Sequence, residues 1–210
     1  EVDLIKDKID VLVSGSQKAI MLPPGVAFVA YSDRAKDRFA EVTTPRFYLD
    51  LNKYLSSQEQ NSTPFTPNVA LFRGVNAYVE LVKHEGLNHV IKRHYSIRNA
   101  LRTALKSLDL ELLVKDDSYA SPTVTSFVPK DKEELTYLKD QLKSRFNITI
   151  AGGQGHLKGH ILRIGHMGKV SPFDILSVVS AIEILLTESR NKNYIGKGIA
   201  QFMEVIKHES

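Results

Sequence analysis

The chain has 210 residues, of which 42% are hydrophobic and 25% charged, a balance typical of soluble globular proteins with one large domain or two modest ones. Its 28 Lys and Arg against 24 Asp and Glu residues give a formal charge of +4, too small and too dispersed to predict a nucleic-acid surface. The chain contains no cysteine, which excludes disulfides, thiolate metal sites and a cysteine nucleophile.

No apolar run approaches membrane-spanning length, and the acidic first residues lack the pattern of a signal peptide. We therefore expect a cytoplasmic protein with no membrane segment and no nucleic-acid partner.

The first 85 residues predict two strands followed by helices. The strands and helices alternate with turns that carry Gly, Pro, Ser and Asn, and the helices begin after residues with cap chemistry. In chain order we expect strands at 9–13 and 26–31, a helix from Asp33 to Glu41, a short helix or loop at 47–55, a polar linker at 56–67 and a helix at 69–83 opened by Thr66 and Pro67. Gly86 then breaks the pattern, and we place a domain boundary there, giving domains 1–85 and 86–210.

The second domain alternates short strands with helices, which predicts an α+β fold with helices packed on one sheet face. We expect a long helix at 87–108 whose Lys, Arg and His residues form a solvated face. The remaining elements are expected as strands at 110–114, 123–128, 148–150 and 160–164, a glycine loop at 151–159, and helices from Asp131 to 145, from Ser171 onward and at 194–206.

Lys18 lies alone in the turn between the first two predicted strands, next to small and polar residues and ahead of Pro23-Pro24-Gly25. A lysine amine is nucleophilic only when deprotonated, and partial burial favours that state. The turn is therefore a suitable place for a nucleophilic amine, although spacing alone favours an ordinary surface lysine beside a tight turn.

Several motifs in a fixed order give a more specific interpretation. They are Ser14-Gly15-Ser16-Gln17-Lys18-Ala19 with Pro23-Pro24-Gly25, Phe47-Tyr48-Leu49-Asp50, Thr63-Pro64-Phe65-Thr66-Pro67, Ala151-Gly152-Gly153-Gln154-Gly155 and Leu162-Arg163-Ile164-Gly165-His166-Met167-Gly168. Together they resemble the class V aminotransferases, in the branch that contains serine–pyruvate and alanine–glyoxylate aminotransferases. The resemblance implies an α/β protein of the pyridoxal-phosphate fold type I, with the end of the large mixed-sheet domain in residues 1–85 and the small C-terminal α+β domain in 86–210.

The resemblance also assigns site residues. It implies that Lys18 binds pyridoxal 5'-phosphate through a carbon–nitrogen double bond, and that Gln17 contacts the cofactor phosphate or ties the turn together. It implies a homodimer in which Thr66 reaches the partner's cofactor phosphate, with simple helix capping as the alternative role. Arg163 matches the family's carboxylate-binding arginine; an internal salt bridge is its alternative, since a charge inside an apolar strand needs a partner.

Other candidates are weaker. Gly152 and Gly153 lie in a glycine-rich loop without the spacing of a P-loop, and the resemblance places this loop beside the substrate entrance. His156, His160 and His166 cluster in the sequence, but nothing places them on one helix face, so we expect no metal site.

The function implied is transamination between a small amino acid, alanine or serine, and a 2-oxo acid, glyoxylate or pyruvate. The resemblance covers only the later half of the family pattern, and the segment that pairs with the pyridine nitrogen and stacks on the ring does not precede Lys18. We therefore expect weak or no cofactor retention by this chain alone. The alternative is a non-catalytic fragment or assembly module that keeps the small-domain fold.

Overall fold

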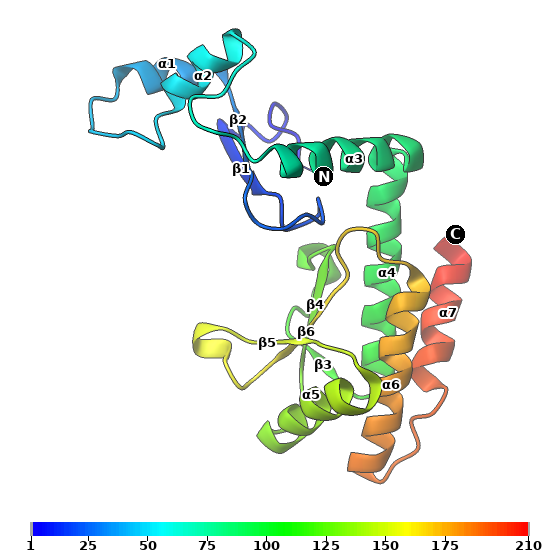
Figure 1. The fold of residues 1–210 in the computed structure, drawn as a ribbon. Coiled ribbons are helices and arrows are strands. Elements are labelled where there is room, and N and C mark those ends of the chain that lie inside the picture. The colour runs from blue at the N-terminus through cyan, green and yellow to red at the C-terminus, as the bar shows by residue number, and fades with distance from the viewer. Residues whose placement is uncertain (1, 210) are drawn as a thin grey trace. The chain divides into compact units, whose positions relative to one another are not determined.

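The computed structural model describes residues 2–209, which divide into two compact units between Glu85 and Gly86. The N-terminal unit runs from blue to green in Figure 1, and the C-terminal unit from green to red.

The N-terminal unit is built on an antiparallel two-stranded ribbon. Its strands pair in a register that runs from Val11 opposite Tyr31 to Gly15 opposite Ala27. The elements are β1 (Val11–Gly15), β2 (Ala27–Tyr31), α1 (Asp33–Glu41), α2 (Leu51–Glu59) and α3 (Val69–Glu85). Ser32 begins α1 by accepting a hydrogen bond from the Ala35 amide, so the helix starts where the sequence predicted it.

This unit has almost no core. Among the apolar side chains described between residues 2 and 85, only Ala35 and Leu71 are buried, while Val11, Leu12 and Val13 are 44%, 38% and 65% exposed. A strand whose consecutive apolar residues are all exposed has no cover on either face, and a two-stranded ribbon is marginally stable in water. A run of consecutive apolar residues such as Val11, Leu12 and Val13 is typical of a strand that is covered on both faces.

The C-terminal unit contains a four-stranded antiparallel sheet in the order β3-β4-β6-β5. Its elements are α4 (Leu87–Ser107), β3 (Glu111–Leu112), η1 (Asp117–Tyr119), β4 (Val124–Val128), α5 (Lys132–Phe146), β5 (Ala151–Gly152), η2 (Gly155–Leu157), β6 (Leu162–Gly165), α6 (Pro172–Arg190) and α7 (Lys197–Glu209). In this unit α4, α6 and α7 run side by side (Figure 1).

One face of this sheet carries the core. Phe127, Leu162 and Ile164 are buried and belong to a cluster that continues through α4, α5 and α6. The alternate residues of the same strands, including Ser126 and Arg163, are only half-buried. The sheet is therefore covered by helices on one side, as the α+β pattern predicted.

Side-chain caps fix where the helices of this unit begin. Asp131 accepts a hydrogen bond from the Glu134 amide at 2.8 Å and starts α5. Ser171 and Asp174 form a reciprocal capping box at the start of α6, with Pro172 in the first turn. Both starts agree with the sequence analysis.

Three expectations are wrong in detail. Residues 148–150 are not a strand; the strand forms at Ala151–Gly152, where it pairs with Arg163 and Leu162 of β6. The linker at 56–67 begins later than expected, because α2 continues to Glu59. The last helix starts at Lys197 rather than 194.

Candidate functional site

The turn that carries Lys18, residues 16–25, is fixed by Ser16. This side chain is fully buried, donates its hydroxyl hydrogen to the Pro23 carbonyl at 2.7 Å and accepts from the Val26 amide at 3.3 Å. The Ser16 backbone also bonds to Val26 and Leu22. One residue thus closes both ends of the turn, which the sequence analysis did not identify; a serine directly after the end of a strand was the available signal.

Lys18 lies at the exposed tip of this turn. Its amide bonds to the Gly15 carbonyl at 3.4 Å, and its carbonyl accepts from the Met21 amide at 2.9 Å. The expected partial burial is wrong for residues 2–209, because the side chain is exposed. Across that range the Lys18 amine forms no ion pair with a carboxylate, so no described side chain holds it away from a ligand.

Gln17 folds back over the preceding glycine. A Cβ built on Gly15 would lie 2.5 Å from Gln17 Oε1, so the amide occupies the space that a side chain at position 15 would need. The backbone at Gln17 is a turn rather than extended. The amide group therefore lies close to the end of β1.

The lysine turn packs against the start of α3. A Cβ at Gly25 would meet Leu71 at 2.6 Å, and one at Gly74 would meet Leu22 at 2.7 Å. The helix is capped by Asn68, whose Oδ1 accepts from the Leu71 amide at 3.1 Å. The capping alternative for Thr66 is therefore wrong: Thr66 is exposed and lies ahead of the cap, and its role at a partner's cofactor stays a prediction.

Arg163 lies on β6, opposite Ser126 of β4 and Ala151 of β5. Its Nε–H donates to the Gly152 carbonyl at 2.8 Å. No Asp or Glu within the described part of the chain pairs with the guanidinium, so the salt-bridge alternative finds no support. One edge of the guanidinium is thus fixed by the backbone, while its two terminal nitrogens have no protein acceptor among those residues.

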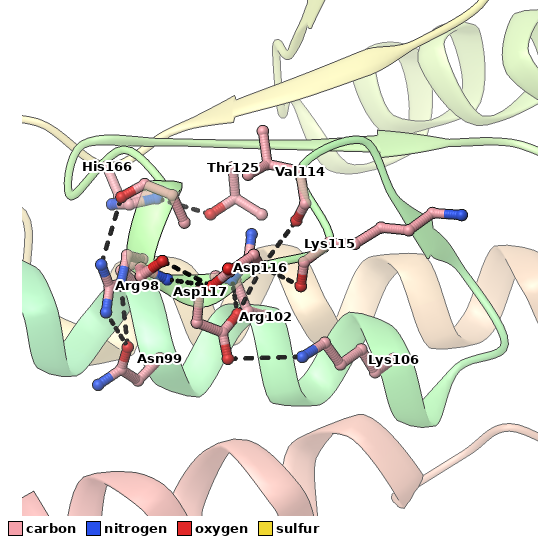
Figure 2. Close-up of polar contacts among 12 residues, drawn as sticks. Arg98, Asn99, Arg102, Lys106, Val114, Lys115, Asp116, Asp117, Thr125 and His166 are labelled. Carbon is pink, nitrogen blue, oxygen red and sulfur yellow. Dashed lines mark hydrogen bonds and ion pairs between the residues drawn. The ribbon is translucent and has the colours of Figure 1, made fainter.

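A buried polar cluster holds the end of β6, as Figure 2 shows in part. His166 Nε2 lies 2.9 Å from Thr125 Oγ1, and both side chains are buried. Burial, with His94 and Arg98 nearby, lowers the pKa of His166 to about 4, so its imidazole is neutral at physiological pH.

Side chains of helix α4 form hydrogen bonds with residues 168–170, which follow β6. His94 Nε2 accepts from the Gly168 amide at 3.1 Å, while its Nδ1 lies 2.7 Å from the Val90 carbonyl. Arg93 donates to the Gly168 and Val170 carbonyls at 3.0 and 2.8 Å. The expectation of a solvated basic face on this helix is thus wrong for these residues; their side chains anchor the motif that contains Arg163.

Arg102 is a further exception on that helix. It is buried and donates to Asp117 Oδ1 at 2.6 Å and to the Val114 carbonyl at 2.8 Å (Figure 2). This bond, together with the positive charges of Arg102 and Lys106, outweighs burial and lowers the pKa of Asp117. The pair ties η1 to α4.

The three clustered histidines do not converge. His166 is buried, whereas His156 and His160 are exposed. Within residues 2–209 no group of three or more His, Cys, Asp or Glu side chains is arranged to hold a metal ion.

Over residues 2–209, no helix has both the length and the apolar character needed to cross a bilayer.

A model of the family "Aminotransferase class-V" matches residues 1–171. The chain belongs to this family. The lysine turn and the Arg163 strand both lie inside the matched range, so the class V assignment covers each candidate residue.

Class V relatives match nearly the whole chain. This chain is 44% identical, over 94% of its length, to the soluble hydrogenase small subunit of Synechococcus. It is 30% identical, over 93% of its length, to L-aspartate–glyoxylate aminotransferase of Paracoccus denitrificans. It covers 51% and 50% of those proteins, so the chain spans about half the length of the curated relatives it matches.

A solved structure establishes the fold. Pyridoxamine–pyruvate aminotransferase of Mesorhizobium loti superposes on the whole chain with a TM-score of 0.91 at 27% identity, and the chain covers 55% of it. The fold is therefore that of the type I pyridoxal-phosphate aminotransferases, of which this chain represents about half. The family's cofactor is pyridoxal 5'-phosphate.

Proposed function

We propose that the chain carries the lysine and the carboxylate-binding arginine of a pyridoxal-phosphate-dependent transaminase. The activity is transfer of an amino group from alanine or serine to glyoxylate or pyruvate. The observation that carries this proposal is Lys18 itself, an amine free of carboxylates among the described residues, at the tip of a turn pinned by buried Ser16, in a chain of the class V family.

The residues present suit the cofactor's aldehyde. An unpaired primary amine on a fixed turn can form a covalent bond with an aldehyde, and Gln17 offers an amide beside it. When bound, pyridoxal phosphate supplies an electron sink for the bonds of the substrate α-carbon. We assign Lys18 Nζ to moving the proton at that α-carbon.

Arg163 is assigned to orienting the substrate. Its Nε is held by Gly152, which leaves the two terminal nitrogens to receive the oxygens of a carboxylate. Planar guanidinium and carboxylate groups match in this bidentate geometry, and the bond is charge-assisted. The absence of a competing carboxylate in the described residues supports this role over an internal salt bridge.

The names of the relatives support the acceptor more firmly than the donor. The Paracoccus enzyme is named for glyoxylate and the Mesorhizobium enzyme for pyruvate, both small 2-oxo acids, but their amino donors are aspartate and pyridoxamine. Both acceptors carry one carboxylate, which a single arginine such as Arg163 can bind. Other relatives are named for the donors proposed here: serine–glyoxylate aminotransferase of Arabidopsis thaliana is 27% identical, and alanine–glyoxylate aminotransferase of Nostoc is 26% identical. Because the donor differs among these names, we choose alanine or serine on the resemblance of the motifs together with these two relatives.

Two relatives, from Synechococcus and Anabaena cylindrica, are named as subunits of a soluble hydrogenase. Hydrogen chemistry at iron–sulfur clusters depends on thiolate ligands, and none of the 210 residues is a cysteine. The chain therefore contributes no thiolate to such a centre.

Activity requires further polypeptide around the lysine. Strand β1 is exposed on both faces and Lys18 is exposed, while the relatives are about twice as long as this chain. We infer that residues 1–85 complete a larger mixed-sheet domain, that 86–210 form the small domain, and that the whole assembles as a homodimer with Thr66 at the partner's cofactor.

Reconstitution tests the proposal. The chain is co-expressed with the half of the Synechococcus relative that it does not match, and the product is supplied with pyridoxal phosphate. We expect a visible absorbance band and formation of glycine from glyoxylate with alanine as donor. Lys18→Ala should abolish the band and lower the rate by roughly 1,000-fold, and Arg163→Ala should weaken glyoxylate use by roughly 100-fold, the equivalent of about 3 kcal/mol of charge-assisted hydrogen bonding.

Lys53→Ala is the matched control. Lys53 is another lysine of the N-terminal unit; it lies in α2 and its amine packs over the ring of Phe47. It should leave band and rate unchanged. A reconstituted protein with the band but equal activity in the Arg163→Ala variant would remove the arginine from the proposal. A protein without the band would favour the non-catalytic assembly module.

A further inference from the structure

Two adjacent glycines, Gly152 and Gly153, have opposite surroundings. A Cβ built on Gly152 meets nothing within 4 Å. A Cβ built on Gly153 would lie 2.0 Å from the Leu157 carbonyl oxygen and 2.5 Å from its carbonyl carbon. These are backbone atoms, so no side-chain rotation relieves the overlap, and a side chain at position 153 must displace the chain itself.

The backbone around Gly153 forms a tight loop. The segment between β5 and β6 turns through η2, with the Leu157 amide bonded to Gln154 and the His160 amide bonded to Leu157. In Figure 1 this yellow loop extends away from α4, α6 and α7. The Leu157 carbonyl is thereby held against Gly153, at a distance only a residue without a side chain tolerates.

The peptide that joins the two glycines is the group that holds Arg163. Its oxygen, the Gly152 carbonyl, accepts from Arg163 Nε at 2.8 Å. Its N–H, which belongs to Gly153, donates to the Ile161 carbonyl at 3.2 Å. A single peptide unit is thus bonded at both ends, and any movement of Gly153 rotates the acceptor that orients the guanidinium.

We propose that Gly153 is a positioning residue for Arg163: position 153 must lack a side chain so that the Gly152–Gly153 peptide can hold the guanidinium in its carboxylate-binding orientation. This rests on the proposed function for Arg163. Gly153 touches no substrate, and its effect is transmitted through the peptide.

The test compares Gly153→Ala with Gly152→Ala in the full chain. Arginine Nε–H signals are recorded by NMR, and that of Arg163 is assigned from its loss in Arg163→Lys. We expect the Arg163 signal to exchange slowly with water in the unaltered chain and in Gly152→Ala, and at least tenfold faster in Gly153→Ala. A scalar coupling across the hydrogen bond to the Gly152 carbonyl should be present in the unaltered chain.

Pyruvate is then titrated into each chain after co-expression with the unmatched half of the Synechococcus relative. We expect at least tenfold weaker binding at Arg163 in Gly153→Ala than in Gly152→Ala. If pyruvate shifts no Arg163 signal in the unaltered chain, the carboxylate role, and with it the proposed function of Arg163, fails, while the exchange rates still decide whether Gly153 positions the guanidinium.

The role of Gly153 is overturned by any of three results. The first is an unchanged Arg163 exchange rate in Gly153→Ala, and the second an equal acceleration in Gly152→Ala. The third is a loss of the native NMR signals of the core residues Phe127 and Leu162 in Gly153→Ala, because the glycine would then be needed for folding rather than for orienting the arginine.

Discussion

At the scale of single residues, His166 shows how burial makes a histidine sensitive to acid. Its imidazole is fully buried beside Thr125, and its pKa is lowered from 6.5 to about 4. Between pH 6.5 and about pH 4 the unfolded chain therefore binds a proton at His166 that the folded chain does not bind. The free energy of unfolding consequently decreases as the pH falls through this range.

We expect the free energy of unfolding to decrease by about 3 kcal/mol between pH 6.5 and pH 4 through this group. Urea unfolding followed by circular dichroism at several pH values measures it. His166→Gln should flatten the dependence in this window, while the exposed His208→Gln should leave it unchanged. Equal pH profiles in all three chains would contradict the buried, neutral imidazole.

Ser16 makes a second prediction at this scale. Replacing it with alanine leaves the Pro23 carbonyl without its donor and the Val26 amide without its side-chain acceptor, which costs about 1–3 kcal/mol locally. We expect faster amide exchange at the non-proline residues between 16 and 25 in Ser16→Ala. Ser14→Ala, on exposed β1, is the control; if both variants exchange alike, Ser16 does not fix the lysine turn.

At the scale of elements, the capping box predicts how α6 responds to substitution. Ser171→Ala removes the side-chain acceptor of the Asp174 amide, which should lower the free energy of unfolding by about 1 kcal/mol. Ser180, within the same helix, bonds only to the Leu176 carbonyl one turn earlier. Ser180→Ala should therefore change stability by less, and thermal melting of both variants compares them.

Caps and strand pairing explain which elements were predictable. The starts of α1, α5 and α6 follow from Ser32, Asp131 and Ser171, because a cap acts within its own turn. The β5 strand was misplaced at 148–150 because its position is decided by pairing with β6, a contact that local β-propensity does not contain.

The candidate site was predictable in part for the same reason. The motifs identified Lys18 and Arg163, but the exposure of Lys18 depends on what covers it, and the cap of α3 depends on whether Asn68 or Thr66 reaches the Leu71 amide. The buried His94 was missed because its acceptor bond to Gly168 joins segments far apart in the sequence.

At the scale of the whole molecule, the two units differ in what holds them together. The C-terminal unit has a continuous core across its sheet and helices, whereas the described part of the N-terminal unit buries only Ala35 and Leu71 among its apolar side chains. Burial of apolar area is the main source of folding free energy, so the units should differ in stability.

Hydrogen exchange of the full chain checks this difference. We expect the amides of β1 and β2 to exchange at least 100-fold faster than those of α4 and α6, and to become protected when the completing half is present. Uniform slow exchange in the chain alone would mean that the ribbon is stable without cover.

The open β1 strand also bears on how the isolated chain behaves in concentrated solution. Val11, Leu12 and Val13 present an uncharged, β-branched-rich stretch with free main-chain groups along an edge. Such an edge templates pairing between copies, so production of the 210-residue chain by itself should yield material that precipitates with rising concentration, and a lysine introduced at position 13 should keep it dissolved.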